Sequence, residues 1–303
     1  MKNSKRVRRV TLFVLIYTML VILFGAYVRA SDSGAGCGAH WPLCNGKVFP
    51  TEPVIETVIE FTHRITSGFS LLFILLLFIY VFKNSQKGIY SRRAVSSALF
   101  FTILEALLGA GLVLFELVGD NDTVLRAVVI SIHLLNTFML LGSLVLLYDW
   151  SGKEISQKKD VPTKKLLWMI LLTIFLLVLS MSGAITALGD TLFPASSLAE
   201  GFQQDISNST HFLIELRIYH PLIAIITILL ILSMLKFGLK GNSEQHNKLR
   251  FTLVGLFLLQ LFLGGLNVLL LAPIWMQIIH LLVADLIWIY FVLFVNRVIY
   301  FDY

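Results

Sequence analysis

Long apolar stretches recur along the whole chain, separated by short polar segments. Eight of them are near or above the roughly 20 residues that a helix needs to cross about 30 Å of hydrocarbon. We therefore predict spans at 8–29, 57–82, 94–118, 124–148, 164–188, 208–235, 249–271 and 275–297. Pro221 lacks the amide that would bond the carbonyl of residue 217, so we expect a kink in the sixth span. The predicted fold class is an all-α integral membrane protein.

Composition and charge agree with this pattern. Hydrophobic residues make up 57% of the chain and charged residues only 14%, too few to cover a soluble domain. Most of the 24 Lys and Arg residues lie in the segments on one side of the spans, and the segments on the other side are acidic. The positive-inside rule then places both termini in the cytoplasm, in a bacterial inner membrane. The net charge of +6 thus reflects topology and predicts no nucleic-acid partner.

The first apolar stretch raises the question of a cleaved leader. It runs from Val10 to Val28, which is longer than the apolar core of a signal peptide. We therefore interpret it as the first membrane span.

The second half of the chain repeats the first. Matches occur in the same order between Gly25-Ala26 and Gly183-Ala184, His63 and His220, 104–110 and 259–265, and Ile132-His133 and Ile279-His280. Each half has an even number of spans, so both halves enter and leave the membrane on the same side. We predict two parallel, pseudo-symmetric four-helix bundles, residues 1–148 and 164–303, joined by the polar cytoplasmic linker 149–163.

Four histidines lie in the even-numbered spans, each in the outer half of the membrane: His63, His133, His220 and His280. A lone histidine in a membrane helix often just bonds a neighbouring hydroxyl. Ionisable groups inside the membrane are nonetheless costly, and two matched pairs favour a function. Two imidazoles at similar depth in one bundle are the arrangement that a bis-histidine haem requires.

Charged residues beside these histidines differ between the halves. Glu60 precedes His63 by three residues, whereas Arg217 holds the matching position in the second half. A carboxylate beside a metal site relays protons or stabilises positive charge. Arg64, Arg126 and Arg217 are candidates to pair with haem propionates.

The spacing of Glu60 and His63 also suits a di-iron carboxylate bundle. That site needs two Glu-x-x-His pairs and two further carboxylates. The second half lacks the matching glutamate, so this alternative is disfavoured. We expect Glu105, whose repeat position holds Gln260, to sit in a hydrogen-bonded polar spot instead.

The only two cysteines, Cys37 and Cys44, both fall in the predicted outer loop 30–56. An oxidising compartment favours a disulfide between them. The alternatives are two free thiols or a metal pair, although this spacing matches no common zinc pattern.

The chain resembles the haem A synthase family, membrane enzymes that convert haem O to haem A for cytochrome oxidase. The resemblance rests on Gly36-Cys37-Gly38, Trp41-Pro42-Leu43-Cys44, Glu60-x-x-His63-Arg64, His133 and His280. The eight-span duplicated layout agrees, and the match covers essentially the whole chain. The loop and the glutamate–histidine–arginine motif are specific only in combination.

The resemblance implies a division of labour between the halves. The N-terminal half would bind the substrate haem through His63 and His133, with Glu60 as the catalytic carboxylate. The C-terminal half would hold a haem b cofactor through His220 and His280. The reaction implied is oxidation of a ring methyl group of haem O to a formyl group by successive hydroxylations. The partners implied, besides membrane lipid, are a haem O synthase and a terminal oxidase.

The chain departs from the family pattern at two points. Pro221 follows His220 where an arginine would complete the repeat, and the outer loop between spans five and six has no cysteine pair. The first departure bears on the geometry of the C-terminal ligands. A di-haem b-type electron-transfer protein and a haem-handling or transport protein are the alternative functions. The electron donor, the source of the formyl oxygen and the oligomeric state, a homo-oligomer included, stay open.

Overall fold

A computed structural model describes residues 2–51, 53–84, 89–151, 161–207, 211–236 and 244–300 of the chain. Its elements are α1 (Lys2–Ala30), the 3-10 turn η1 (Ser33–Ala35), α2 (Ile55–Asn84), α3 (Ile89–Leu114), α4 (Val124–Trp150), α5 (Thr163–Leu192), α6 (Leu198–Ile206), α7 (Phe212–Glu215), α8 (Tyr219–Lys236), α9 (Glu244–Leu269) and α10 (Ile274–Tyr300). Within the described ranges, eight helical segments are long and apolar enough to cross a membrane. The predicted fold class, an all-α multi-pass membrane protein, is confirmed.

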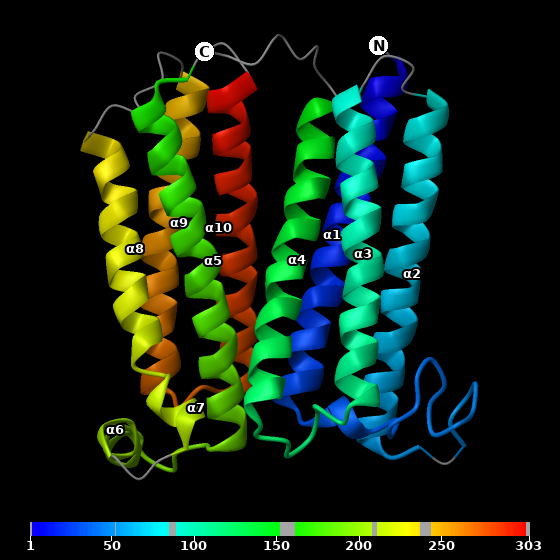
Figure 1. Cartoon of the computed structure of the whole chain (residues 1–303), viewed down its shortest axis with the longest axis vertical. Coiled ribbons are helices and arrows are strands. Elements are labelled where there is room, and N and C mark those ends of the chain that lie inside the picture. Colours follow the sequence, from blue (N-terminus) through cyan, green and yellow to red (C-terminus); the bar gives the residue numbers. More distant parts are fainter. Residues whose placement is uncertain are drawn as a thin grey trace.

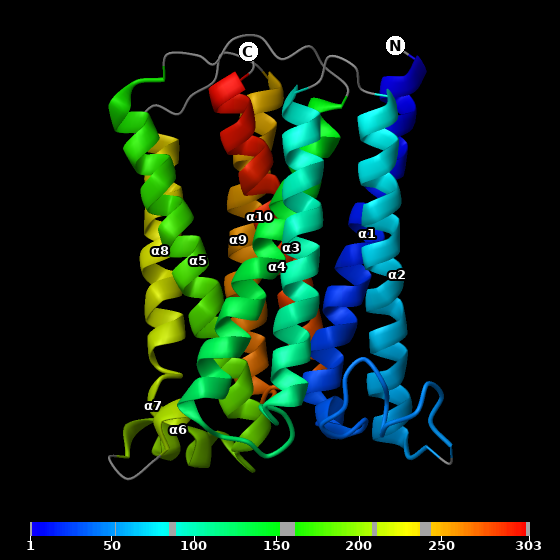
Figure 2. The same cartoon turned by 45° about the vertical axis from the view of Figure 1, so that its right-hand side comes forward.

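The long helices stand side by side in two groups (Figure 1). Helices α1–α4 form one half, and α5 with α8, α9 and α10 forms the other. The turned view in Figure 2 keeps the start of α1 and the end of α10 at the same end of the molecule. Helices α1, α4, α5 and α10 contact one another where the halves meet.

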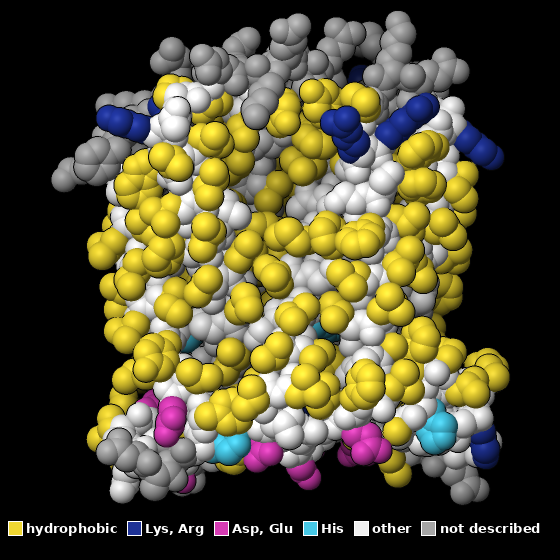
Figure 3. Space-filling model, viewed as in Figure 1, with side chains coloured by type: hydrophobic (Ala, Val, Ile, Leu, Met, Phe, Trp, Pro, Cys, Tyr) yellow, Lys and Arg dark blue, Asp and Glu magenta, His cyan; other side chains and the backbone are white. Residues whose placement is uncertain are grey.

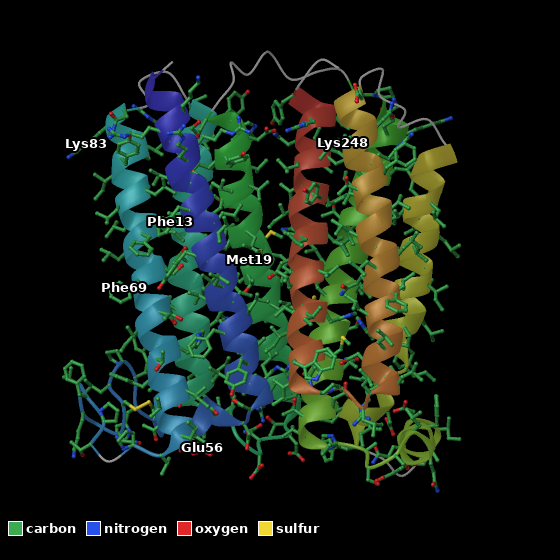
Figure 4. The ribbon with its side chains drawn as sticks, turned by 180° about the vertical axis from the view of Figure 1, so that it is seen from behind. Phe13, Met19, Glu56, Phe69, Lys83 and Lys248 are labelled. Atoms are coloured by element: carbon green, nitrogen blue, oxygen red, sulfur yellow. A yellow bond between two sulfur atoms is a disulfide. The ribbon has the colours of Figure 1, made fainter. Side chains whose placement is uncertain are left out.

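The two ends of the molecule carry opposite charge. Lys and Arg side chains gather at the end where α1 begins, and Asp and Glu side chains gather at the opposite end (Figure 3). Lys83 and Lys248 mark the first, which we call the basic end, and Glu56 marks the second, the acidic end (Figure 4). Between the ends the surface is apolar, and Phe13 and Phe69 are 56% and 48% exposed there. This is the surface expected of a protein surrounded by lipid.

A continuous apolar core joins the two halves. The rings of Phe138 in α4 and Trp288 in α10 stack with centroids 5.3 Å apart, and Trp288 Nε1 donates to the Phe138 carbonyl at 2.6 Å. Near the basic end, Asn296 Nδ2 donates to Asp149 Oδ2 at 2.9 Å. Helix α4 continues to Trp150, so it includes the first two residues of the predicted linker 149–163. Residues 152–160 of that linker lie outside the described ranges.

Helices α3 and α9 end in the same way. Glu116 and Leu271 both take a left-handed backbone, with φ of 53° and 61°. In each case the next amide bonds back to the carbonyl five residues earlier, the Schellman pattern that satisfies the last carbonyls of a helix. The separation of Glu116 and Leu271 in the sequence equals that of the matched repeat positions Leu104 and Leu259. The Schellman motif therefore occurs at equivalent positions of the two halves. The helices α3 and α9 therefore end at Leu114 and Leu269, a few residues before the predicted span ends at 118 and 271.

The sixth predicted span, 208–235, is not one helix. Helix α7 ends at Glu215, a turn follows, and α8 begins at Tyr219; residues 208–210 lie outside the described ranges. Pro221 lies in the first turn of α8, where its missing N–H costs nothing. The expected kink is therefore confirmed, and it takes the form of a break. The short helix α6 was not predicted.

Candidate functional site

His220 and His280 face each other inside the C-terminal half. His220 is the second residue of α8 because the chain restarts there before Pro221, and His280 lies in α10. Their ring centroids are 6.4 Å apart. A metal–imidazole bond is about 2.0–2.1 Å, so two rings on opposite sides of one metal have centroids roughly 6–6.5 Å apart. The pair therefore fits a group that takes two axial imidazoles, such as haem.

The two rings are held differently. Ser182 of α5 lies 3.0 Å from His220 Nδ1, so this hydrogen bond orients the ring and leaves Nε2 for a ligand. His280 Nδ1 is buried and has no hydrogen-bond partner among the described residues. No hydrogen bond from a described residue therefore orients this ring through Nδ1, in contrast to His220.

His63 and His133 form the matching pair in the N-terminal half. His63 lies in α2 and His133 in α4, at the positions that the repeat matches to His220 and His280. Phe24 meets His63 edge-on, with ring centroids 5.5 Å apart. His63 Nδ1 is buried without a hydrogen-bond partner in the described part of the chain, and His133 Nδ1 lies 3.4 Å from a carboxylate oxygen of Glu105. The structure thus brings His220 and His280 together, and the pairing of His63 with His133 stays a prediction.

A glycine packs against one histidine of each pair. A Cβ on Gly25 would lie 3.0 Å from His63 Cε1, and a Cβ on Gly183 would lie 3.0 Å from His220 Cε1. These are the two glycines that the repeat matched. The absence of a side chain lets α1 and α5 approach the imidazoles closely.

Gly183→Ala is expected to weaken the His220 site, because the ring must shift by a few tenths of an ångström to admit the methyl group. Elsewhere in a helix the same change stabilises by roughly 0.4–1 kcal/mol. The measurements are the spectrum and affinity of haem added to the purified protein. Gly265→Ala is the matched control, since no atom lies within 4 Å of the position that its new Cβ would take. Equal haem affinities in the two variants would contradict the contact.

Glu105 supplies a carboxylate to the N-terminal pair. Its Oε1 lies 3.4 Å from His133 Nδ1 and accepts a hydrogen bond from Thr137 at 2.6 Å, and Asn136 Nδ2 donates to Oε2. The predicted hydrogen-bonded polar spot is confirmed. Sequence reasoning missed the contact with His133, although the four-residue spacing of His133 and Thr137 on one helix face could have indicated it.

Glu60 ties the acidic-end loop to α2. Its carboxylate accepts a hydrogen bond from Cys37 N at 2.7 Å and one from Arg64 Nε at 3.0 Å. Arg64 Nη1 in turn donates to the carbonyls of His40 and Leu43, each at 2.6 Å. Glu60 is buried, and its negative charge is thus balanced by Arg64. The catalytic role of Glu60 stays a prediction, because these contacts also give it a structural one.

The loop itself is closed by a disulfide. Cys37 and Cys44 are bonded, with Cα atoms 4.4 Å apart, so the predicted pairing is confirmed. Gly36 packs directly on α2: a Cβ there would lie 2.4 Å from the Glu56 carbonyl carbon. Thr57 Oγ1 donates to the Gly36 carbonyl at 2.7 Å. The disulfide loop is therefore held against α2 beside Glu60.

Replacing Cys37 and Cys44 together with serine is expected to lower the free energy of unfolding by roughly 2–3 kcal/mol, the chain-entropy value for so short a loop. Thermal unfolding in detergent, with and without a reductant, measures the change. Reductant should destabilise the parent protein and leave the double variant unaffected. If neither the double substitution nor the reductant changes the midpoint temperature of unfolding, the disulfide does not stabilise the loop.

The three arginines predicted to meet propionates have protein partners. Arg64 bonds Glu60 and the loop, as described above. Arg126 donates to the carbonyls of Gly119 and Asn121. Arg217 lies 3.3 Å from Asp190 and 3.9 Å from Asp205. Their role as propionate partners stays a prediction.

Contacts of two side chains near the acidic end were not predicted from the sequence. Arg29 of α1 donates to the Ala187 carbonyl at 2.6 Å and to Gln277 Oε1 at 2.8 Å, so it joins the two halves. His211 lies 3.4 Å from Asp122 across the same boundary. Nothing in the sequence pattern pointed to these contacts, because both depend on how the halves dock.

The described residues contain no group of three or more His, Cys, Asp or Glu side chains that could hold a metal ion. The disfavoured di-iron carboxylate site therefore finds no support in this part of the chain. A haem needs only two protein ligands and is compatible with the paired histidines.

Fold and site together define a multi-pass membrane protein with two half-buried histidines in each half. The sequence profile of the family described as "Cytochrome oxidase assembly protein" matches residues 8–292. The chain belongs to this family, and the family resemblance seen in the sequence is confirmed.

Individual relatives carry two different names. A Thermus thermophilus protein named "Protoheme IX farnesyltransferase" is 45% identical over 282 residues, which are 92% of this chain and 46% of that protein. A "Heme A synthase" from Exiguobacterium sp. is 36% identical over 45% of this chain and 44% of its own length. A "Heme A synthase" from Bacillus licheniformis is 30% identical over 60% of this chain and 58% of its own. The chain spans about half the length of the curated relatives it matches.

Proposed function

We propose that this protein is a haem A synthase, an oxidoreductase that converts a ring methyl group of haem O into a formyl group. The observation that carries the proposal is the 6.4 Å spacing of His220 and His280, which fits two ligands of one iron. His63 and His133 hold the matching positions of the repeat. The family and several relatives named heme A synthase support it.

The two halves would have different roles. The C-terminal pair, His220 and His280, would hold a haem b cofactor, and the N-terminal pair, His63 and His133, would bind the substrate haem. The carboxylates Glu60 and Glu105 lie only in the N-terminal half, since Arg217 and Gln260 hold the repeat positions. A bound haem supplies the redox-active iron that side chains lack. The asymmetry in carboxylates supports placing the chemistry in the N-terminal half.

The side chains of the site would bind, orient and carry protons. Glu105 would orient His133 through Nδ1, as carboxylates commonly do for histidine ligands of metals. Ser182 would do the same for His220. Glu60, held by Arg64, would accept or deliver a proton at its carboxylate oxygens. The disulfide loop would cover Glu60 and limit its access to water.

Glu105→Ala is expected to lower the affinity of the N-terminal half for haem by about 10–100-fold, the usual effect of removing such an orienting partner. Titration of the purified protein with haem, followed by absorption, measures this affinity. Gln260→Ala, at the repeat position, is the matched control and should leave the N-terminal affinity unchanged. A similar loss in both variants would show that helix packing, not the carboxylate, is responsible.

The charge distribution supports an orientation in the membrane. The basic end, with Lys83 and Lys248, would face the cytoplasm, together with both termini. The disulfide loop would then lie on the oxidising outer side of a bacterial cytoplasmic membrane.

The Thermus relative suggests a partner. In that protein a region similar to this chain makes up under half of a longer chain named for transferring a farnesyl group to protohaem IX. We assign that activity to the part of the relative that this chain does not match. A separate protein with that activity would supply farnesylated haem to this one, and a terminal oxidase would receive the product.

Chromatography of extracted pigments tests the proposal. The chain is expressed in cells that make haem O but no haem A, and the haems bound to the purified protein are identified. Haem A in the extract, absent from the His63→Ala variant, is the expected result. Haem b alone, with a haem that quinol reduces normally, would instead indicate a di-haem electron-transfer protein.

A further inference from the structure

Helix α6 lies across the bundle, whereas the long helices run from one end of the molecule to the other. Figure 1 and the reverse view in Figure 4 both look down the axis of α6, at the acidic end. Its nine residues, Leu198–Ile206, make a helix about 14 Å long, too short to span a membrane. In a protein that spans a membrane, a helix with this orientation runs parallel to the membrane surface.

A local cap explains why so short a segment is helical. Ser197 at the N-cap accepts a hydrogen bond from Glu200 N at 3.2 Å. The Glu200 carboxylate in turn accepts from Ser196 N at 2.9 Å and from Gln204 Nε2 at 3.3 Å. A serine N-cap contributes about 1 kcal/mol to helix stability. The helix is therefore stabilised by side chains of its own segment.

The polar side chains of α6 are its less exposed ones. Glu200, Gln204 and Asp205 lie on one side of the helix at 100° per residue, and all three are half-buried. Asp205 lies 3.9 Å from Arg217, which is in the turn between α7 and α8. The polar side of α6 is therefore turned toward the rest of the protein.

The other side of α6 is apolar and exposed. Leu198, Phe202 and Ile206 follow one another at four-residue spacing, which places them on one stripe of the helix. They are 37%, 63% and 77% exposed. A surface helix of a soluble protein has the reverse arrangement, with its apolar stripe packed against the core and its polar side in water. The inverted pattern indicates that an apolar partner covers the stripe.

The surroundings of α6 favour lipid as this partner. Helix α6 packs against α7, and α7 and α8 belong to a candidate membrane span, Phe212–Ser233. Large apolar side chains are also exposed in the turn after α7 and at the start of α8: Leu216, Ile218, Tyr219 and Leu222. The stripe is therefore next to a surface that faces hydrocarbon, at the level where a span ends.

The charge of α6 indicates which part of the lipid it meets. Its nine residues include two carboxylates and neither lysine nor arginine. Interfacial helices that are attracted to anionic headgroups carry lysine and arginine on their polar face. The attraction of α6 to a membrane would therefore come from apolar contact alone.

We propose that α6 is an interfacial helix, with Leu198, Phe202 and Ile206 inserted among the acyl chains of the leaflet at the acidic end. Its partner is the phospholipid bilayer, recognised by its apolar part and not by the charge of its headgroups. This inference depends on the protein lying in a membrane and not on its being a haem A synthase.

Fluorescence quenching in vesicles tests the position of the stripe. Both native cysteines are in the disulfide, so an introduced cysteine supplies the one free thiol. The full chain with Phe202→Cys is labelled with an environment-sensitive fluorophore and reconstituted in phosphatidylcholine. Nitroxides on the acyl chains are expected to quench this label more strongly than iodide present on both sides of the membrane. Ile206→Cys should behave alike and serves if Phe202→Cys fails to fold.

Asp120→Cys is the matched control, because Asp120 is an exposed acidic-end residue in the loop between α3 and α4. Its label should be quenched more strongly by iodide. Stronger quenching by iodide at residues 202 and 206 would place the stripe in water and overturn the proposal. Protection from both quenchers would overturn it too, since protein, such as a second copy of the chain, would then cover the stripe. Nitroxide quenching that requires added phosphatidylglycerol would contradict attraction by apolar contact alone.

Discussion

His280→Ala is expected to abolish the haem spectrum of the C-terminal half, and His220→Ala should do the same. The two rings are spaced at 6.4 Å to share one iron, so either change removes one of only two protein ligands. Absorption spectra of the purified variants, reduced and oxidised, measure the loss. Imidazole added to the buffer should partly restore the spectrum by entering the space that the alanine leaves.

His211→Ala is the matched control for these variants. His211 also lies near the acidic end, but its partner is Asp122 and it faces no second histidine among the described residues. The His211→Ala variant should bind haem as the parent protein does. An unchanged spectrum in His280→Ala would remove this residue from the site and with it the proposed cofactor.

Glu60→Gln is expected to keep both haem sites and to lower the yield of haem A by at least about 100-fold, the lower range for loss of a proton-transferring group. The amide matches the carboxylate in shape, so it can still accept from Cys37 N while losing the charge that faces Arg64. The ratio of haem A to haem O in pigment extracts measures the effect.

Because Glu60 also anchors the disulfide loop, a structural control is required. Thr57→Val removes another hydrogen bond between α2 and the loop, at the Gly36 carbonyl, and leaves the carboxylate untouched. It should lower the thermal unfolding midpoint and preserve most of the activity. If Thr57→Val loses as much product as Glu60→Gln, the glutamate acts by holding the loop and not by moving protons.

The spans, the repeat and the candidate ligands were predictable because their signals are local. A residue in hydrocarbon is selected for apolarity wherever the helix lies, so length and composition alone reveal a span. Two cysteines in one short loop leave little choice of partner, as Cys37 and Cys44 show. The interruption of the sixth span was also predictable from a local signal, since a proline such as Pro221 lacks the backbone N–H in any surroundings.

The polar contacts were decided by packing. Glu60 of α2 accepts a hydrogen bond from Cys37 N, which lies in the loop outside that helix. Glu105 of α3 reaches His133 of the neighbouring α4. Arg29 bonds groups in the opposite half of the molecule. Which groups become partners depends on the rotation and depth of each helix against its neighbours. The rotation and depth of a helix are in turn set by the packing of many side chains together.

The sequence by itself therefore determined the number and class of the candidate membrane spans, the order of the repeat and which histidines lie on those spans. Only the tertiary structure decided that His220 and His280 stand at the spacing of two ligands and that Glu60 is shared with the loop. Hydropathy acts on each residue independently, whereas the partner of a buried charge depends on which helices meet around it.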